Sequence, residues 1–174
     1  MTEPVIGTLL AIVLVLAVYL DIQTSLIPNW LTFTATGIAL LTHIWLQGVQ
    51  GAIFSLFGLG TGLIVFVIPF MLGRMGAGDV KLMGAVGAMI GPYGVFISGL
   101  LAMIVGGIYA LAAMSYQWGI ATTTRKLASR AVGTLMIRDT HWGQDLTLPY
   151  NLRYGLAIAS GTLLFRFGLH PFGG

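Results

Sequence analysis

Residues 80–118 read VKLMGAVGAMIGPYGVFISGLLAMIVGGIYALAAMSYQW, an apolar stretch whose only charge is on Lys81. As one α-helix, this stretch would measure about 58 Å, nearly twice the roughly 30 Å hydrocarbon core of a bilayer. Gly91-Pro92 lies near its middle, and this dipeptide favours a turn. The stretch therefore predicts two membrane spans, at residues 80–90 and 94–118.

The whole chain shares this apolar character. Of its 174 residues, 57% are hydrophobic and 7% are charged, whereas an average globular protein has roughly 25% charged residues. Such a chain cannot cover itself with a solvated surface, which excludes a soluble enzyme, a disordered tail and a coiled coil. The 25 glycines favour close packing of transmembrane helices over a β-barrel. The sequence contains no cysteine, which excludes disulfides, cysteine-ligated metals and thiol nucleophiles.

Polar breaks divide the rest of the chain into further apolar segments. The first segment lacks a positively charged region before it, so we expect a retained span rather than a cleaved signal. Only one long polar segment occurs, and we expect residues 119–148 to form a loop. The predicted fold is an all-α, polytopic bundle of six transmembrane helices in one domain, residues 1–174. The remaining predicted spans are residues 5–20, 30–46, 52–72 and 150–167.

The basic residues are distributed unequally across this topology. Six spans place the breaks at residues 21–29, 73–81 and 119–148 on one side of the membrane. By the positive-inside rule that side is cytoplasmic, so we expect a multi-pass membrane protein with both termini outside. The basic residues form no dense run, so nucleic acid is not an expected partner. On the cytoplasmic side, the three breaks and their margins carry seven basic residues, and the other side carries only Arg166. The seven are Arg74, Lys81, Arg125, Lys126, Arg130, Arg138 and Arg153.

Two of the five acidic residues adjoin apolar spans, and the topology places both at the cytoplasmic face. These are Asp21 and Asp79. Ionisable groups at such positions are costly and usually functional, although a carboxylate can also simply complement a helix dipole, as Asp79 would just before Val80. Two neighbouring carboxyls share a proton, so one can take a proton from water while the other donates to a carbonyl. This pair is typical of aspartyl peptide hydrolysis.

The remaining acidic residues are less suited to catalysis. Glu3 is terminal, and Asp139 and Asp145 fit solvated loop carboxylates. Asp79, by contrast, is the last residue of the motif Gly76-Ala77-Gly78-Asp79. Its glycines permit backbone conformations closed to other residues and allow a substrate or a facing helix to come close.

These motifs, taken together, resemble those of the type IV prepilin leader peptidases, which are GxGD-type intramembrane aspartyl proteases. The resemblance covers almost the whole chain in order. It rests on Asp21 followed by Ile27-Pro28-Asn29, on Gly76-Ala77-Gly78-Asp79-Val80-Lys81-Leu82, and on Leu148-Pro149-Tyr150 with the downstream YGLAIASG at residues 154–161.

The resemblance implies a role for each motif residue. Asp21 and Asp79 would be the catalytic dyad, and Gly76 and Gly78 would shape the loop that presents the second aspartate. The segment Ile27, Pro28 and Asn29 would fix the entry of the next span, with helix capping as the structural alternative. Lys81 would pair with an acidic group or a lipid phosphate, or would act as a positive-inside anchor.

The resemblance also implies a substrate. It would be a prepilin with a basic leader, cleaved at the cytoplasmic membrane boundary. Larger members carry a four-cysteine zinc site and methylate the new N-terminus. This chain has no cysteine and few residues before Asp21, so it is similar to the short peptidases of tight-adherence (Flp-type) pilus systems. We therefore expect no methyltransferase activity, no cofactor and no metal. Gln23 and Ser25 stand where many members have basic residues.

Two alternatives stay open at this point. One is an archaeal preflagellin or other signal-peptide peptidase with the same chemistry, and the other is a non-catalytic transporter or scaffold whose aspartates form an ion or proton site.

Other features of the sequence favour structural roles. His43, His141 and His170 match no metal site. Gly58-x-x-x-Gly62 and Gly87-x-x-x-Gly91 favour packing within the chain over a homodimer. Residues 122–138 fit an amphipathic helix on anionic lipid, ahead of a substrate-gripping role.

Overall fold

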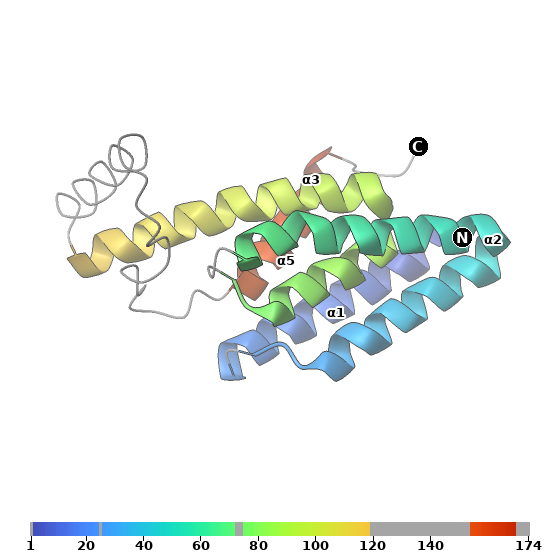
Figure 1. Ribbon diagram of the computed structural model, residues 1–174, viewed down its shortest axis with the longest axis horizontal. Coiled ribbons are helices and arrows are strands. Elements are labelled where there is room, and N and C mark those ends of the chain that lie inside the picture. The colour runs from blue at the N-terminus through green and yellow to red at the C-terminus, as the bar shows by residue number, and fades with distance from the viewer. Residues whose placement is uncertain (1, 25, 72–74, 119–153, 170–174) are drawn as a thin grey trace.

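The computed structural model describes residues 2–24, 26–71, 75–118 and 154–169, and the regular structure in these ranges is helical (Figure 1). In this part of the chain, three helices are long and apolar enough to cross a membrane, and α5 is a shorter apolar helix. The predicted all-α membrane class is therefore confirmed. The predicted loop at 119–148, the amphipathic segment and the first residues of the last predicted span lie outside the described residues. The elements are α1 (Thr2–Thr24), α2 (Asn29–Met71), α3 (Ala77–Trp118), α5 (Tyr154–Leu164) and a π-helical turn, Phe165–Leu169.

Helices α2 and α3 are each interrupted by one glycine. Gly48 has φ 62° and ψ −138°, and Gly91 has φ 76° and ψ 177°. Both φ values lie in the left-handed region, which favours glycine because it has no Cβ. The chain reverses direction at each interruption (Figure 1). Gly48 falls in the break between the predicted spans 30–46 and 52–72, and Gly91 belongs to the predicted turn at Gly91-Pro92.

Side chains from α2 form hydrogen bonds with backbone carbonyls of α3 next to its interruption. Pro92 has no N–H, so the carbonyl of Ala88 loses its helical partner, and the Ser55 hydroxyl donates to it at 2.9 Å. His43 Nε2 forms a hydrogen bond with the carbonyl of Met89 at 3.2 Å. Both side chains are buried. His43 therefore has a structural hydrogen bond at the interruption of α3, which agrees with the structural role expected for this histidine.

Glycines bring the second part of α2 against the first part of α3. A Cβ on Gly58 would overlap the carbonyl of Gly87, and one on Gly87 would overlap the carbonyl of Gly58. A Cβ on Gly62 would overlap the carbonyl of Met83. The backbones touch because no side chains separate them, as in other small-residue contacts between membrane helices. These glycines are used for packing within the chain.

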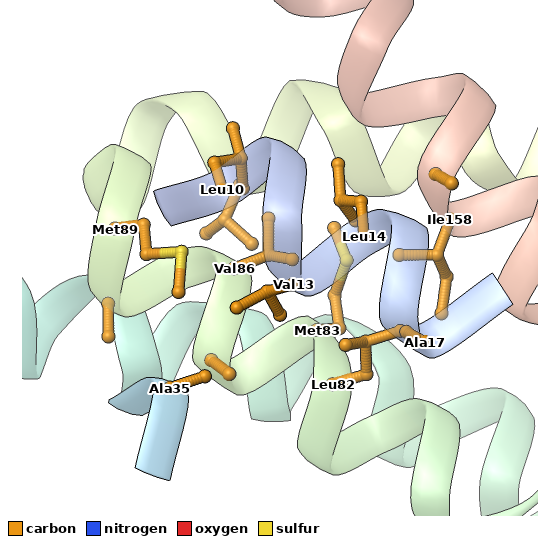
Figure 2. Close-up of a cluster of buried hydrophobic side chains, with 14 of the residues drawn as sticks. Leu10, Val13, Leu14, Ala17, Ala35, Leu82, Met83, Val86, Met89 and Ile158 are labelled. Atoms are coloured by element: carbon orange, nitrogen blue, oxygen red, sulfur yellow. The ribbon is translucent and has the colours of Figure 1, made fainter. Parts of the chain in front are cut away.

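The core continues through α1 and leads to an aspartate. The buried face of α1 repeats at helical spacing through Leu10, Val13, Leu14 and Ala17. Figure 2 shows these side chains over Met83, Val86 and Met89 of α3, with Ile158 of α5 beside Ala17. Asp21 is four residues beyond Ala17, so the same helical face carries it into the protein interior.

We expect Gly58→Ala to destabilise the protein by about 1–3 kcal/mol, because the added methyl group forces the two backbones apart. Thermal unfolding in detergent measures this effect. Gly60→Ala is the matched control on the same helix, because a Cβ there meets nothing within 4 Å. Equal stability of the two variants would contradict the packing described here.

We expect Ser55→Ala to cost about 1–3 kcal/mol, because it leaves the buried carbonyl of Ala88 without its donor. The control is Thr34→Ala, since the Thr34 hydroxyl bonds only carbonyls of its own helix, those of Trp30 and Leu31. Thermal unfolding of both variants measures the difference. A loss no larger for Ser55→Ala than for Thr34→Ala would show that this bond does not stabilise the break.

Candidate active site

Asp21 lies inside α1 rather than after it. The sequence predicted that the first span ends at residue 20, but the helix continues to Thr24, so Asp21 stands at the start of its last turn. The reason is that Asp21 continues the buried face of α1 and that its charge is compensated locally. Its side chain is 6% exposed, and Oδ2 accepts a hydrogen bond from the N–H of Gly155 at 3.1 Å.

Asp79 lies in the first turn of α3. Its Oδ2 accepts the N–H of Gly76 at 3.2 Å, and its own N–H donates to the carbonyl of Gly76 at 3.1 Å. An acidic residue three positions after the cap commonly makes this contact at a helix N-terminus. The helix-terminal role considered for Asp79 is therefore present. The side chain is nevertheless 8% exposed, which is unusual for a capping carboxylate in water.

The two aspartates come together. The end of α1 that carries Asp21 and the beginning of α3 lie at the same end of the bundle (Figure 1). The two carboxylates are close enough for their charges to repel each other. Because both are largely removed from solvent, a single shared proton relieves this repulsion. Such a pair can act as one general base and one general acid.

The segment before α2 packs against the GxGD motif. Ile27 is buried, and a Cβ on Gly78 would lie 3.1 Å from its Cβ and 3.2 Å from its carbonyl oxygen. A Cβ on Gly76 would lie 3.3 Å from Oδ2 of Asp79. Among the described residues, positive φ occurs only at Gly48 and Gly91. Gly76 and Gly78 thus provide space rather than the unusual backbone conformations that the motif suggested.

Lys81 links the two motifs. Its Nζ donates to Oδ1 of Asn29 at 2.8 Å and lies 5.9 Å from the centroid of the Phe33 ring. The sequence had suggested an acidic partner or a lipid phosphate, whereas the observed partner is a neutral side-chain amide at the start of α2. Pro28 precedes that helix, and its carbonyl accepts the N–H of Leu31 at 3.2 Å. The predicted supporting residues therefore surround the beginning of α2 and the beginning of α3.

One residue of the site was missed by sequence reasoning. Gly155 donates to Asp21 from the first turn of α5, and the only signal was its place in the YGLAIASG stretch. Asp139, Asp145 and the Leu148-Pro149-Tyr150 motif lie outside the described residues. Among the residues that the structure does describe, no three His, Cys, Asp or Glu side chains gather into a group that could hold a metal ion.

A helical membrane bundle with two buried, interacting aspartates defines the class of candidate intramembrane aspartyl proteases. The model of the type IV leader peptidase family, peptidase A24, matches residues 8–111. This match covers more than half of the chain and includes both aspartates, so the chain belongs to that family and is an aspartic prepilin peptidase. Neither the comparison with curated proteins nor that with solved structures gave a match.

The contact between Lys81 and Asn29 predicts an energetic coupling. We expect a double-mutant cycle with Lys81→Ala and Asn29→Ala to give a coupling energy of about 0.5–1.5 kcal/mol, because the hydrogen bond involves a charged donor but is partly exposed. Thermal unfolding in detergent provides the four stabilities. The pair Lys81→Ala and Thr36→Ala serves as a control, since the Thr36 hydroxyl bonds only the carbonyl of Thr32. Strictly additive effects for the first pair would contradict the observed contact.

Proposed function

We propose that Asp21 and Asp79 are the catalytic dyad with which this peptidase removes the leader from Flp-type prepilins. One observation carries the proposal. The two carboxylates come from different helices, are both buried and have interacting charges at one end of the bundle. Two like charges placed together in an apolar interior are typical of a shared-proton site.

The reaction needs only these two groups and water. The ionised carboxylate takes a proton from a water molecule, whose oxygen bonds to the carbonyl carbon of the scissile peptide. The protonated carboxyl donates its proton toward the carbonyl oxygen and so stabilises the negative charge that develops there. A proton then passes to the amide nitrogen, the C–N bond breaks, and the leader leaves with the new carboxyl group. The proton count of the dyad is restored at the end of the cycle.

We infer that the active site faces the cytoplasm in a six-span arrangement. The interruptions at Gly48 and Gly91 divide α2 and α3 into two parts each, which with α1 and α5 gives six α-helical segments among the residues that the structure describes. Lys81 lies at the end that holds the aspartates, whereas the Arg166 side chain lies beside Gly7 near the N-terminus. This distribution supports an inner-membrane protein with a cytoplasmic site and both termini outside.

The Flp-type substrate rests on the absence of cysteine from residues 1–174, because the larger members of the family carry a four-cysteine zinc site. A preflagellin or another signal peptide is the alternative substrate for the same chemistry. Co-expression with one substrate of each kind separates the two. Efficient cleavage of the Flp-type prepilin with slow or absent cleavage of the preflagellin supports the proposal, and the reverse preference contradicts it.

We expect Asp21→Asn and Asp79→Asn each to lower prepilin cleavage by about a thousandfold, because each removes a proton acceptor or donor from the reaction. Leader removal is followed by gel shift and by the N-terminal mass of the pilin.

The matched control is Asp145→Asn, an isosteric change at a carboxylate that the sequence assigns to the polar loop. All variants are compared at equal abundance in the membrane. Cleavage that survives either Asp21→Asn or Asp79→Asn would reject the two-aspartate mechanism.

A further inference from the structure

The first turn of α5 meets the Asp21 side chain directly. The Gly155 N–H donates to Oδ2 of Asp21 at 3.1 Å, although the two residues are 134 positions apart in the chain. The N–H groups in the first turn of a helix have no partner within that helix. The contact therefore satisfies a free donor of α5 and a buried carboxylate of α1 at the same time.

The contact leaves no space for a side chain on α5. A Cβ on Gly155 would lie 2.8 Å from Oδ2 of Asp21, 3.1 Å from its Cβ and 3.2 Å from its Cγ. Real Cβ atoms essentially never show the first of these distances. Any residue other than glycine would displace the carboxylate or the helix.

The position of the donor is set by the packing of α5. Ile158 is fully buried and lies beside Ala17 (Figure 2). A Cβ on Gly161 would come within 2.9 Å of three atoms of Ala102 in α3, so these two helices are in close contact. The Gly155 N–H is thus held in place by contacts with both α1 and α3.

The helix dipoles around Asp21 also favour a donor from α5. Asp21 stands in the last turn of α1, where the partial negative charge of the helix dipole opposes a carboxylate. The N-terminus of α5 has the opposite partial charge and approaches the same carboxylate. Asp79 differs, because its donor, Gly76, is only three residues away and directly precedes the helix α3 that carries Asp79.

We infer that Gly155 is a positioning residue, which holds the Asp21 carboxylate in its reactive place through a backbone hydrogen bond from α5. This inference rests on the proposed function of the aspartate pair. It makes the last helix a part of the active site, although α5 lies beyond the residues matched by the family model.

The test is the kinetics of Gly155→Ala on a Flp-type prepilin. We expect kcat to fall about 100-fold, the cost of displacing a reacting group by about 1 Å, with KM nearly unchanged because Asp21 acts in the chemical step. The control is Gly107→Ala in α3, where a Cβ meets nothing within 4 Å, and it should cleave like the wild type. A merely structural role would lower the amount of active enzyme and leave kcat per folded molecule unchanged.

A second measurement needs no catalysis. We expect Gly155→Ala to lower Tm in the wild-type background and much less in the Asp21→Ala background, because the truncation removes Oδ2 and Cγ from the crowded site. If Gly155→Ala alone does not accumulate in the membrane, Asp21→Ala should restore it.

An equal Tm loss in both backgrounds, or no restoration, would overturn the inference. Wild-type kcat for Gly155→Ala, with Asp21→Asn inactive, would overturn the inference and leave the proposed function standing. Undiminished cleavage by Asp21→Asn would overturn both.

Discussion

The rest of the structure depends on one constraint, which is that two like-charged carboxyl groups must be buried at one end of an apolar bundle. Burial of an unpaired carboxylate is costly. Each aspartate is compensated by a backbone N–H at a helix N-terminus, which is Gly155 for Asp21 and Gly76 for Asp79. Both donors are uncharged backbone groups, so each supports its carboxylate without itself adding positive charge. The pair can therefore keep a shared proton, as general acid–base chemistry requires.

Close packing keeps these helix ends in place. The glycine contact between Gly58 and Gly87 brings α2 against the helix that carries Asp79. Ile27 fills the space beside Gly78, and Lys81 reaches across to Asn29. The far end of the same part of α3 is held by the Ser55 hydroxyl at the Pro92 break. The first part of α3, which carries Asp79, is thus held against α2 at both of its ends.

Local sequence patterns predicted the fold class, the two interruptions and the residues of the aspartate pair. The turn at Gly91-Pro92 was recognisable because the helical stretch is too long for a bilayer, and the buried face of α1 repeats at helical spacing up to Asp21. The contacts of the site were not predictable in the same way. The first span was predicted to end at residue 20, before Asp21, whereas the helix continues to Thr24. Lys81 was expected to pair with an acidic group or a lipid phosphate, or to act as a positive-inside anchor, and its contact with Asn29 was not predicted. The role of Gly155 depends on helices far apart in the chain, which leave no local pattern.

The most direct test of the central claim is whether residues 21 and 79 are neighbours in the membrane. The chain has no cysteine, so Asp21→Cys combined with Asp79→Cys creates the only thiols available to a short bismaleimide cross-linker. We predict an intramolecular cross-link in native membranes for this pair. Asp21→Cys combined with Gly48→Cys should give none, because the last turn of α1 and the interruption of α2 lie at opposite ends of the bundle (Figure 1). Failure of the first pair to cross-link, with each thiol still reactive toward a monomaleimide, would contradict a site built from both aspartates.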